Sequence, residues 1–280
     1  MVEADPIRLV LSDVDGTLLT SGKVLTDATR GAVQRLHDAE IGFTITSSRP
    51  PPGLGMFVAP LGITLPMGAF NGGAFCDPEL RVLDQHAIRG ATVGPIIERI
   101  DASGLDVWVY RANQWLVRSA TGPHVEHESI VVQFTPTVVP NFDGFDAGTD
   151  TDGVAKIVGV SDDHDLVAEA ERQVTAEFGG EVSATRSQSY YLDVTHPQAN
   201  KGAVVDYLSR SLDIPRSAIA TIGDGQNDTL MFARSVTSIA MGNGAAGVRN
   251  AATYSTISND EDGFALAMDQ FILARNDRSA

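Results

Sequence analysis

The chain has 280 residues, of which 43% are hydrophobic and 20% charged, as in a globular protein with one large domain or two smaller ones. Lys and Arg together number 20 against 36 Asp and Glu, which gives a net charge of -16. That charge argues against binding to nucleic acid or to an anionic membrane through a diffuse basic surface. The single cysteine, Cys76, excludes an intramolecular disulfide framework and a multi-cysteine zinc site.

The sequence contains no apolar run near the ~20 residues that a membrane span requires. Its first residues lack the basic and then apolar layout of a secretory signal. We therefore expect a cytoplasmic protein without a membrane partner, and the sequence leaves the oligomeric state open.

The N-terminal part of the chain predicts alternating strands and helices. Residues 7–11 form a short apolar run, typical of a strand buried on both faces of a parallel sheet. Thr26 can cap the helix that follows. Two further strands are predicted at 43–46 and 65–70, and the three prolines at 50–52 between them cannot pair as regular strand.

The C-terminal part predicts the same alternation. The patterns indicate helices at 202–212, 227–233 and 263–274, and strands at 218–222 and 238–241. Alternating elements at both ends of the chain predict one doubly wound α/β domain assembled from both ends.

The middle of the chain predicts a second unit inserted into the first. Residues 104–119 alternate as paired strands do, and a strand, a helix and a further extended stretch follow over 155–194. We therefore predict a core domain at 1–86 and 188–280 and an inserted α/β domain at 87–187.

Two acidic segments follow buried strands of the predicted core. Asp13-Val14-Asp15-Gly16 ends the first strand, and Gly223-Asp224-Gly225-Gln226-Asn227-Asp228 follows the strand at 218–222. Ligands bind at the carboxyl edge of an open α/β sheet, so we expect the two segments to meet there. Each segment alone could be a solvated loop or a helix-capping turn, but their equivalent positions favour a shared site.

Three or four carboxylates at one place repel one another and raise each other's pKa values. A hard dication would neutralise them, and an all-oxygen site with few protein ligands suits Mg²⁺. Such an ion predicts an anionic substrate, for which Ser47, the Ser48 amide and Lys201 are candidate partners. Taken individually, the serine could be a turn cap and the lysine a solvated side chain.

In combination and order, these segments resemble phosphatases of the haloacid dehalogenase superfamily, in particular the Cof-like branch with a type-two, subtype-B cap. The resemblance covers most of both core segments, whereas the insert carries almost no signature. It implies a Rossmann-like core and an inserted α/β cap that closes over the substrate. The segments that carry it are Asp13–Leu18, Ser47–Pro50, Asn71–Gly73, Asn200–Gly202, Gly223–Asp228, Met241–Gly244 and Ser258–Gly263.

The resemblance also implies a role for each site residue. Asp13 would be the nucleophile and Asp15 the general acid and base. Mg²⁺ would be held by the Asp13 carboxylate, the Asp15 main-chain carbonyl and Asp224, with support from Asp228. The ion and Lys201 would keep Asp13 ionised. The implied phosphate-binding residues are Val14, Ser47, Ser48, Lys201 and Asn227, and Arg49 and Asn71 are assigned to the substrate entrance.

We therefore predict a Mg²⁺-dependent phosphatase that hydrolyses a small phosphorylated metabolite, in the first place a sugar phosphate, through an aspartyl-phosphate. Two alternatives stay open: a phosphomutase-type phosphotransferase with the same intermediate, and a non-catalytic sensor of a phosphorylated metabolite. Ser48 stands where the family usually has glycine, and the prolines at 50–52 are atypical, so the geometry of the substrate entrance is left open.

Two further patterns in the insert have simpler interpretations. His124 and His127 could bind a second metal, but a solvated acidic surface segment is the favoured interpretation. Five aromatic residues could stack on a sugar ring, but a core role is favoured for them; they are Trp108, Tyr110, Trp115, Tyr190 and Tyr191.

Overall fold

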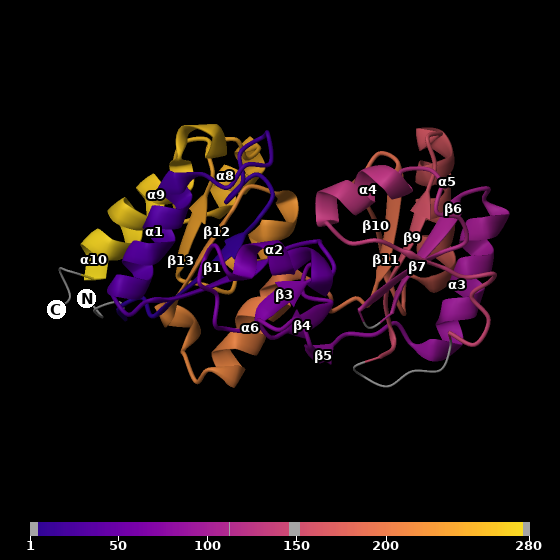
Figure 1. Ribbon diagram of the computed structural model, residues 1–280, viewed down its shortest axis with the longest axis horizontal. Helices are drawn as coiled ribbons and strands as arrows, with labels where there is room; N and C mark the ends of the chain where they lie inside the picture. The colour runs from indigo at the N-terminus through magenta and orange to yellow at the C-terminus, as the bar shows by residue number, and fades with distance from the viewer. Residues whose placement is uncertain (1–4, 112, 146–151, 277–280) are drawn as a thin grey trace.

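The computed structural model describes residues 5–111, 113–145 and 152–276. Within these residues the chain forms two α/β units that lie side by side in Figure 1, the first built from both ends of the chain and the second from its middle. The strands described form one sheet of eight and one of six. No helix in these ranges is long and apolar enough to cross a membrane.

The first unit is a doubly wound α/β domain, as predicted. Its sheet has the order β14-β13-β12-β1-β2-β3-β4-β5, parallel from β14 to β3 and antiparallel at the β3-β4-β5 edge. The central strands are buried along almost their whole length, which explains their apolar runs. The strands are β1 (Leu9–Asp13), β2 (Gly42–Thr46), β3 (Met67–Ala69), β4 (Ala74–Cys76), β5 (Val82–Gln85), β12 (Ile219–Gly223), β13 (Thr237–Ala240) and β14 (Tyr254–Ser255).

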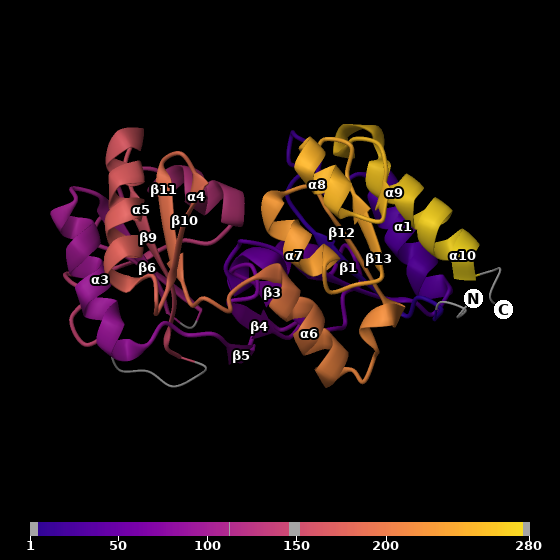
Figure 2. The same ribbon diagram turned by 180° about the vertical axis from the view of Figure 1, so that it is seen from behind.

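Helices cover both faces of this sheet. Apolar side chains of α1 and α9 pack on one face, and those of α6, α7 and α8 pack on the other, which faces the viewer in Figure 2. Thr26 caps α1 as predicted, because its hydroxyl accepts a hydrogen bond from the Thr29 amide. The helices are α1 (Asp27–Asp38), α6 (Lys201–Ser211), α7 (Thr229–Phe232), α8 (Ala246–Ala251), α9 (Gly263–Ala267) and α10 (Ala274–Asn276), the last two joined by a π-helical turn at Met268–Leu273.

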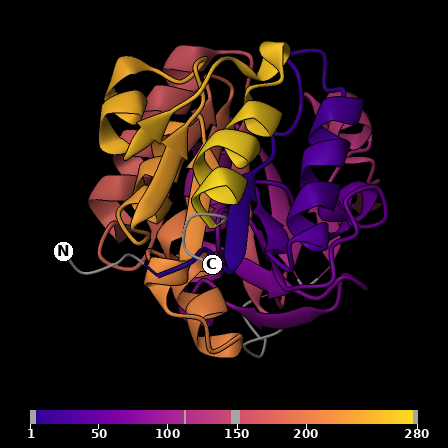
Figure 3. The ribbon, with the colours of Figure 1, turned by 90° about the vertical axis from the view of Figure 1, so that its left-hand side faces the viewer.

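Hydrogen bonds join the two halves of this unit near the ends of the described chain. The Ile7 amide donates to Asn276 Oδ1 at 3.0 Å, and Asn276 Nδ2 donates to the Ile7 carbonyl at 2.8 Å. The indigo first strand and the yellow last helix accordingly lie side by side in Figure 3. The unit therefore folds from segments separated by the whole insert.

The second unit is a sheet with the order β10-β11-β9-β6-β7-β8, antiparallel except for β7 and β8. Its outer face packs on α3 (Gly90–Ala102) and α5 (His164–Phe178), and its inner face lies toward the first unit (Figure 1). The strands are β6 (Asp106–Arg111), β7 (Gln114–Val117), β8 (Thr137–Val138), β9 (Val154–Val160), β10 (Ser183–Gln188) and β11 (Tyr191–Thr195).

The second unit extends further along the chain than the predicted boundary at 187/188. That boundary falls inside β10, and β11 pairs antiparallel with both β10 and β9. The second sheet therefore ends at Thr195. An extended stretch up to 194 is predicted from the sequence, but which sheet it joins is not, because pairing with β9 is a long-range contact.

Most of the aromatic side chains of the insert are buried on the face of its sheet that is turned toward the first unit, in one apolar cluster with residues of that unit. Trp108 and Trp115 are at most 1% exposed and pack edge to face with ring centroids 5.0 Å apart, and Tyr110 stacks on Trp115. Tyr190 instead stacks on His124, whose Nε2 lies 2.8 Å from Asp162 Oδ1. Within the described ranges, no cluster of potential metal ligands includes His124 or its neighbour His127.

The proline run forms part of the contact between the two units. Pro51–Leu54 is a 3-10 turn that continues into α2 (Gly55–Val58). Helix α4 (Val125–Val132) of the second unit contacts this turn, and Val132 lies against Gly53. The fixed φ of proline makes the turn a rigid support for the insert.

The position of Lys201 depends on a glycine in a neighbouring turn. Gly72, after β3, has a φ of +91°, and a Cβ at this position would lie 2.4 Å from the Asn200 carbonyl oxygen. Asn200 caps α6 by accepting a hydrogen bond from the Ala203 amide, and Lys201 is the next residue. A side chain at position 72 would therefore displace the start of α6.

We expect Gly72→Ala to lower the free energy of unfolding by about 2–4 kcal/mol, because it combines a strained φ with a backbone overlap. Urea denaturation measures this change. The control is Gly247→Ala in α8, an exposed position where an added Cβ meets no atom within 4 Å. This control should change stability by about 1 kcal/mol or less, in the stabilising direction. Equal losses in both variants would contradict the prediction.

Candidate functional site

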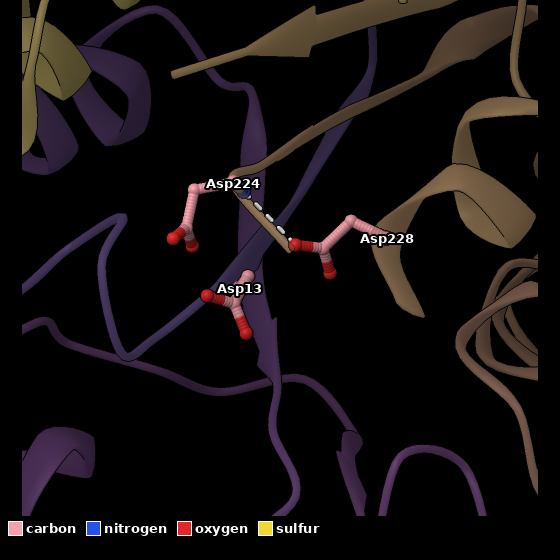
Figure 4. Close-up of side chains that lie close together, drawn as sticks. All are labelled: Asp13, Asp224 and Asp228. Carbon is pink, nitrogen blue, oxygen red and sulfur yellow. Dashed lines mark hydrogen bonds between the residues drawn. The ribbon is translucent and has the colours of Figure 1, made fainter. Parts of the chain in front are cut away.

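Three carboxylates meet at the carboxyl edge of the first sheet. Asp13 is the last residue of β1, Asp224 follows β12, and Asp228 lies in the turn before α7. One oxygen of each lies within 4.8 Å of the others, and Figure 4 shows the three side chains converging. The structure thus brings together the two acidic segments that the sequence places 211 residues apart.

A buried lysine contacts two of these carboxylates. Lys201 Nζ donates hydrogen bonds to Asp13 Oδ1 and Asp228 Oδ1, and the lysine side chain is 1% exposed. Burial alone would lower the pKa of Lys201, but the two carboxylates raise it above its ordinary value. Lys201 is therefore a permanent cation at this site.

One ammonium does not balance the three carboxylates. Burial raises the pKa of Asp13 to about 8, with further increases from Asp228 and Asp224, and these effects exceed the lowering by Lys201. Lys201 lowers the pKa of Asp13, in the direction expected, but without an ion the protein favours a protonated Asp13. The site lacks positive charge, and its donors are all carboxylate oxygens. That donor set fits a hard dication such as Mg²⁺.

Asp228 organises the loop around the site. Its Oδ2 accepts hydrogen bonds from the amides of Asp224 at 2.9 Å and Gly225 at 2.8 Å, and its Oδ1 accepts from Lys201. Asp228 thus accepts from an ammonium on one oxygen and from two amides on the other, and its side chain is 1% exposed. It therefore fits a supporting role better than that of a direct metal ligand.

Asp224 is held in place by residues that the sequence reasoning did not assign. Thr17 Oγ1 donates to its Oδ1 at 3.1 Å, and Asn243 Nδ2 donates to its Oδ2 at 3.1 Å and to the Gly16 carbonyl at 2.9 Å. Gly16, with a φ of +88°, allows this approach, because a Cβ there would lie 2.3 Å from Asp224 Oδ2. Thr17 and Asn243 lie inside recognised segments, but nothing in their spacing shows what they contact.

The Asp15 side chain does not join the carboxylate cluster. Arg49 donates two hydrogen bonds to the Asp15 carboxylate, at 2.9 Å and 3.0 Å, and Lys23 Nζ lies 2.8 Å from Asp15 Oδ1. Burial alone would raise the pKa of Asp15, but Arg49 and then Lys23 lower it to about 2. Asp15 is therefore a carboxylate in this arrangement and must leave Arg49 before it can carry a proton.

Arg49 connects Asp15 with the second unit. Its Nη1 donates to the Val131 carbonyl at the end of α4, at 2.6 Å, while the other guanidinium nitrogens hold Asp15. Arg49 is 5% exposed. We assigned it to the substrate entrance, and in the structure it lies in the contact between the two units.

The remaining predicted residues border the same edge. Ser47 follows β2 and is buried, and its hydroxyl accepts a hydrogen bond from the Arg49 amide at 3.2 Å. Asn227 Nδ2 donates to Asn71 Oδ1 at 3.0 Å. The Val14 side chain is fully buried, so this residue can offer only its main chain to a ligand.

A cavity of about 240 Å³ extends from this edge to the inner face of the second sheet. Residues of both units line it. From the first unit these include Ser48, Asn71, Lys201 and Asn227, and from the second unit Lys156, Ser183, Thr185, Asp193 and Thr195.

Comparisons with known proteins agree with this architecture. The haloacid dehalogenase-like hydrolase family matches residues 10–268. A putative phosphatase from Streptococcus pyogenes serotype M6 is 26% identical over 286 residues, which cover 95% of this chain and 99% of the relative. A Bacillus subtilis relative named 5-amino-6-(5-phospho-D-ribitylamino)uracil phosphatase is 24% identical, with 95% and 98% of the two chains covered.

Solved structures share the fold over the same extent. A haloacid dehalogenase-like hydrolase from Bacteroides thetaiotaomicron superposes with a TM-score of 0.85 at 25% identity, covering 94% of this chain and 99% of the other. A protein described as a subclass IIB sugar phosphatase has a TM-score of 0.79 at 22% identity, covering 94% and 98%. The second comparison is evidence of a common fold alone.

The raised pKa of Asp13 predicts how the stability of the metal-free protein varies with pH. Between its ordinary pKa of 3.8 and about 8, the folded protein holds a proton on Asp13 that the unfolded chain has released. The free energy of unfolding must therefore fall as the pH rises through this window, by at most ~1.4 kcal/mol per pH unit from this group.

Urea denaturation of the wild type and Asp13→Asn in chelator measures this effect. Because the variant lacks the titrating group, the wild type should lose stability relative to it between about pH 6 and pH 7.5. A stability difference that stays constant over this range would contradict the protonation of Asp13.

Proposed function

The chain belongs to the haloacid dehalogenase-like hydrolases and is a phosphatase of that family, and we propose that it hydrolyses a small phosphorylated metabolite through an aspartyl-phosphate at Asp13. The observation that carries this proposal is the convergence of Asp13, Asp224 and Lys201 at the carboxyl edge of the sheet. Phosphoryl transfer depends mainly on positioning and on charge neutralisation, and this cluster provides both.

Asp13 is the nucleophile in this proposal. A carboxylate oxygen of Asp13 attacks phosphorus, and the bond from phosphorus to the leaving oxygen breaks. Water then attacks the same phosphorus and releases Asp13 and inorganic phosphate. The hydrogen bond from Lys201 fixes the orientation of the Asp13 carboxylate, because both side chains are buried and cannot rotate into solvent.

Mg²⁺ fits the oxygen donors at this edge, where the Asp13 and Asp224 carboxylates and the Asp15 main-chain carbonyl would hold it. When bound, the ion supplies the positive charge that keeps Asp13 ionised and neutralises the phosphoryl group. Lys201, the Ser47 hydroxyl, Asn227 and the main-chain amides of Val14 and Ser48 are the proposed partners of the phosphoryl oxygens.

Asp15 gives a proton to the leaving oxygen and later takes one from the attacking water. In the described arrangement Asp15 is bound to Arg49, which also contacts Val131 of the insert. We therefore expect Asp15 to exchange Arg49 for the substrate when the insert, acting as the cap, moves relative to the core.

A sugar phosphate is the proposed substrate class. Hydroxyl and charged side chains of the cap and amide side chains of the core line the cavity next to the phosphoryl end of the site. One relative is named for a phospho-D-ribitylamino compound, and one solved structure is described as a sugar phosphatase. Both names support a phosphate ester on a hydroxylated carbon chain.

Phosphate release from an aryl phosphate and a panel of sugar phosphates tests the function directly. Release should require Mg²⁺, stop in chelator and fall by at least ~10³-fold in Asp13→Asn, because the variant lacks the nucleophile. A phosphorylated sugar acceptor formed in place of free phosphate would instead identify a phosphotransferase. Ligand binding without turnover in well-folded protein would indicate a sensor.

The role of Asp15 predicts a dependence on the leaving group. Asp15→Asn should lower kcat/KM, which covers only the steps up to formation of the aspartyl-phosphate, by about 10²–10⁴-fold for alkyl phosphates, whose leaving oxygen needs a proton. The loss should be clearly smaller for a nitrophenyl phosphate, whose leaving group departs as an anion. Equal losses on both kinds of ester would argue against proton donation by Asp15.

A further inference from the structure

Lys156 and Asp193 form an ion pair on the wall of the cavity between cap and core. We propose that this pair determines substrate specificity: it binds adjacent hydroxyl groups of a neutral leaving group and disfavours a leaving group that carries a second anionic group. The proposal rests on the phosphatase function above and identifies the residues that distinguish one phosphate ester from another.

The pair lies on the face of the cap sheet that is turned toward the core. Lys156 of β9 pairs in register with Thr195 of β11 and with Tyr110 of β6, so the three side chains share one face. Asp193, two residues before Thr195, lies on the same face. The cavity that both charged residues line also reaches Lys201 and Asn227 in the core. A substrate with its phosphate at Asp13 would therefore extend its leaving group toward the pair.

Stability does not explain why the pair is present. Only 12% of the Lys156 side chain and 9% of the Asp193 side chain are exposed, and Nζ lies 2.9 Å from Oδ1. They sit on a face that otherwise buries Trp108, Tyr110 and Val158. Removing two charges from water offsets most of their attraction, so hydrophobic residues would stabilise this face at least as well.

The pair has unused hydrogen-bonding capacity. Asp193 Oδ1 is buried against Lys156 Nζ, 2.9 Å away, and is therefore out of reach of a ligand. The oxygen of Asp193 that remains for a hydroxyl group in the cavity is Oδ2. The Lys156 ammonium has three N–H groups and lies 6.0 Å from the centre of the Tyr110 ring. An acceptor and a donor thus stand side by side, which complements two neighbouring hydroxyl groups.

The charge balance and size of the cavity limit the leaving group further. Lys156 and Lys201 are the cations among the residues lining it, and each is already paired with carboxylates. Neither is therefore free to neutralise a second phosphate. The volume of about 240 Å³ lies below the ~300–1,000 Å³ of sites for drug-sized ligands. These properties favour the monophosphate of a short polyol or a single sugar.

The experiment compares kcat/KM of the wild type, Lys156→Met and Asp193→Asn on four substrates: a polyol monophosphate, its analogue without one hydroxyl, the corresponding bisphosphate and phenyl phosphate. Both variants should lose at least ~10-fold on the polyol monophosphate, because an unpaired polar group then remains in the complex. They should change less than about 2-fold on phenyl phosphate, which has no hydroxyl to bind. The analogue should show a smaller loss than the full polyol.

Arg99→Met is the matched control, because Arg99 forms an exposed ion pair with Glu177 on the outer helices of the cap. This variant should leave all four rates unchanged.

Asp193→Asn should also gain activity on the bisphosphate relative to the monophosphate, a change that misfolding cannot produce. With Lys156 no longer neutralised, the ratio of bisphosphate to monophosphate kcat/KM should rise by about 10-fold.

Two results would overturn the proposal: equal losses on polyol and phenyl phosphates, or an unchanged bisphosphate ratio in Asp193→Asn. Both leave the phosphatase function intact, because the wild type still releases phosphate. A wild type that releases no phosphate from any of the four substrates would overturn the phosphatase function and this inference together.

Discussion

The contact of Lys201 with Asp13 and Asp228 is the interaction on which the rest of the site depends. It joins the end of β1, the start of α6 and the turn before α7, which come from opposite ends of the chain. A buried ammonium is stabilised by carboxylate partners and clustered carboxylates are stabilised by a cation, so the charge state of each group depends on the others. The site forms only when the segments on both sides of the inserted cap have paired.

The charges around this contact decide whether so acidic a protein can bind an anion. The net charge of -16 acts at long range and is screened beyond ~8 Å at physiological salt. Binding is decided by the local charges instead, and one lysine among three carboxylates leaves that local balance negative. Burial, and then the Asp228 and Asp224 carboxylates, raise the pKa of Asp13, and Lys201 offsets only part of this increase. In the proposed mechanism a dication would correct the local balance and keep Asp13 ionised.

The features that depend on local sequence patterns could be predicted from the sequence. Apolar runs placed β1 and β12, and the residues directly after them could be assigned to one edge because parallel strands share that edge. Contacts across the two units were not predictable in this way. Arg49 forms hydrogen bonds with Asp15, and β11 pairs with β9 of the cap sheet. Both contacts depend on how segments distant in the sequence pack. Lys156 and Asp193 likewise lie in strands without a recognisable motif.

We propose that the protein supplies too little positive charge for its ligand and that a metal ion supplies the rest. Calorimetric titration of inorganic phosphate into the wild-type protein, once with Mg²⁺ and once with chelator, measures this dependence. We expect measurable phosphate binding with Mg²⁺ and at least ~10-fold weaker binding in chelator. In Asp224→Asn the effect of Mg²⁺ on phosphate affinity should be much smaller. Equal phosphate affinity of the wild type in both conditions would show that no metal ion is needed to bind phosphate.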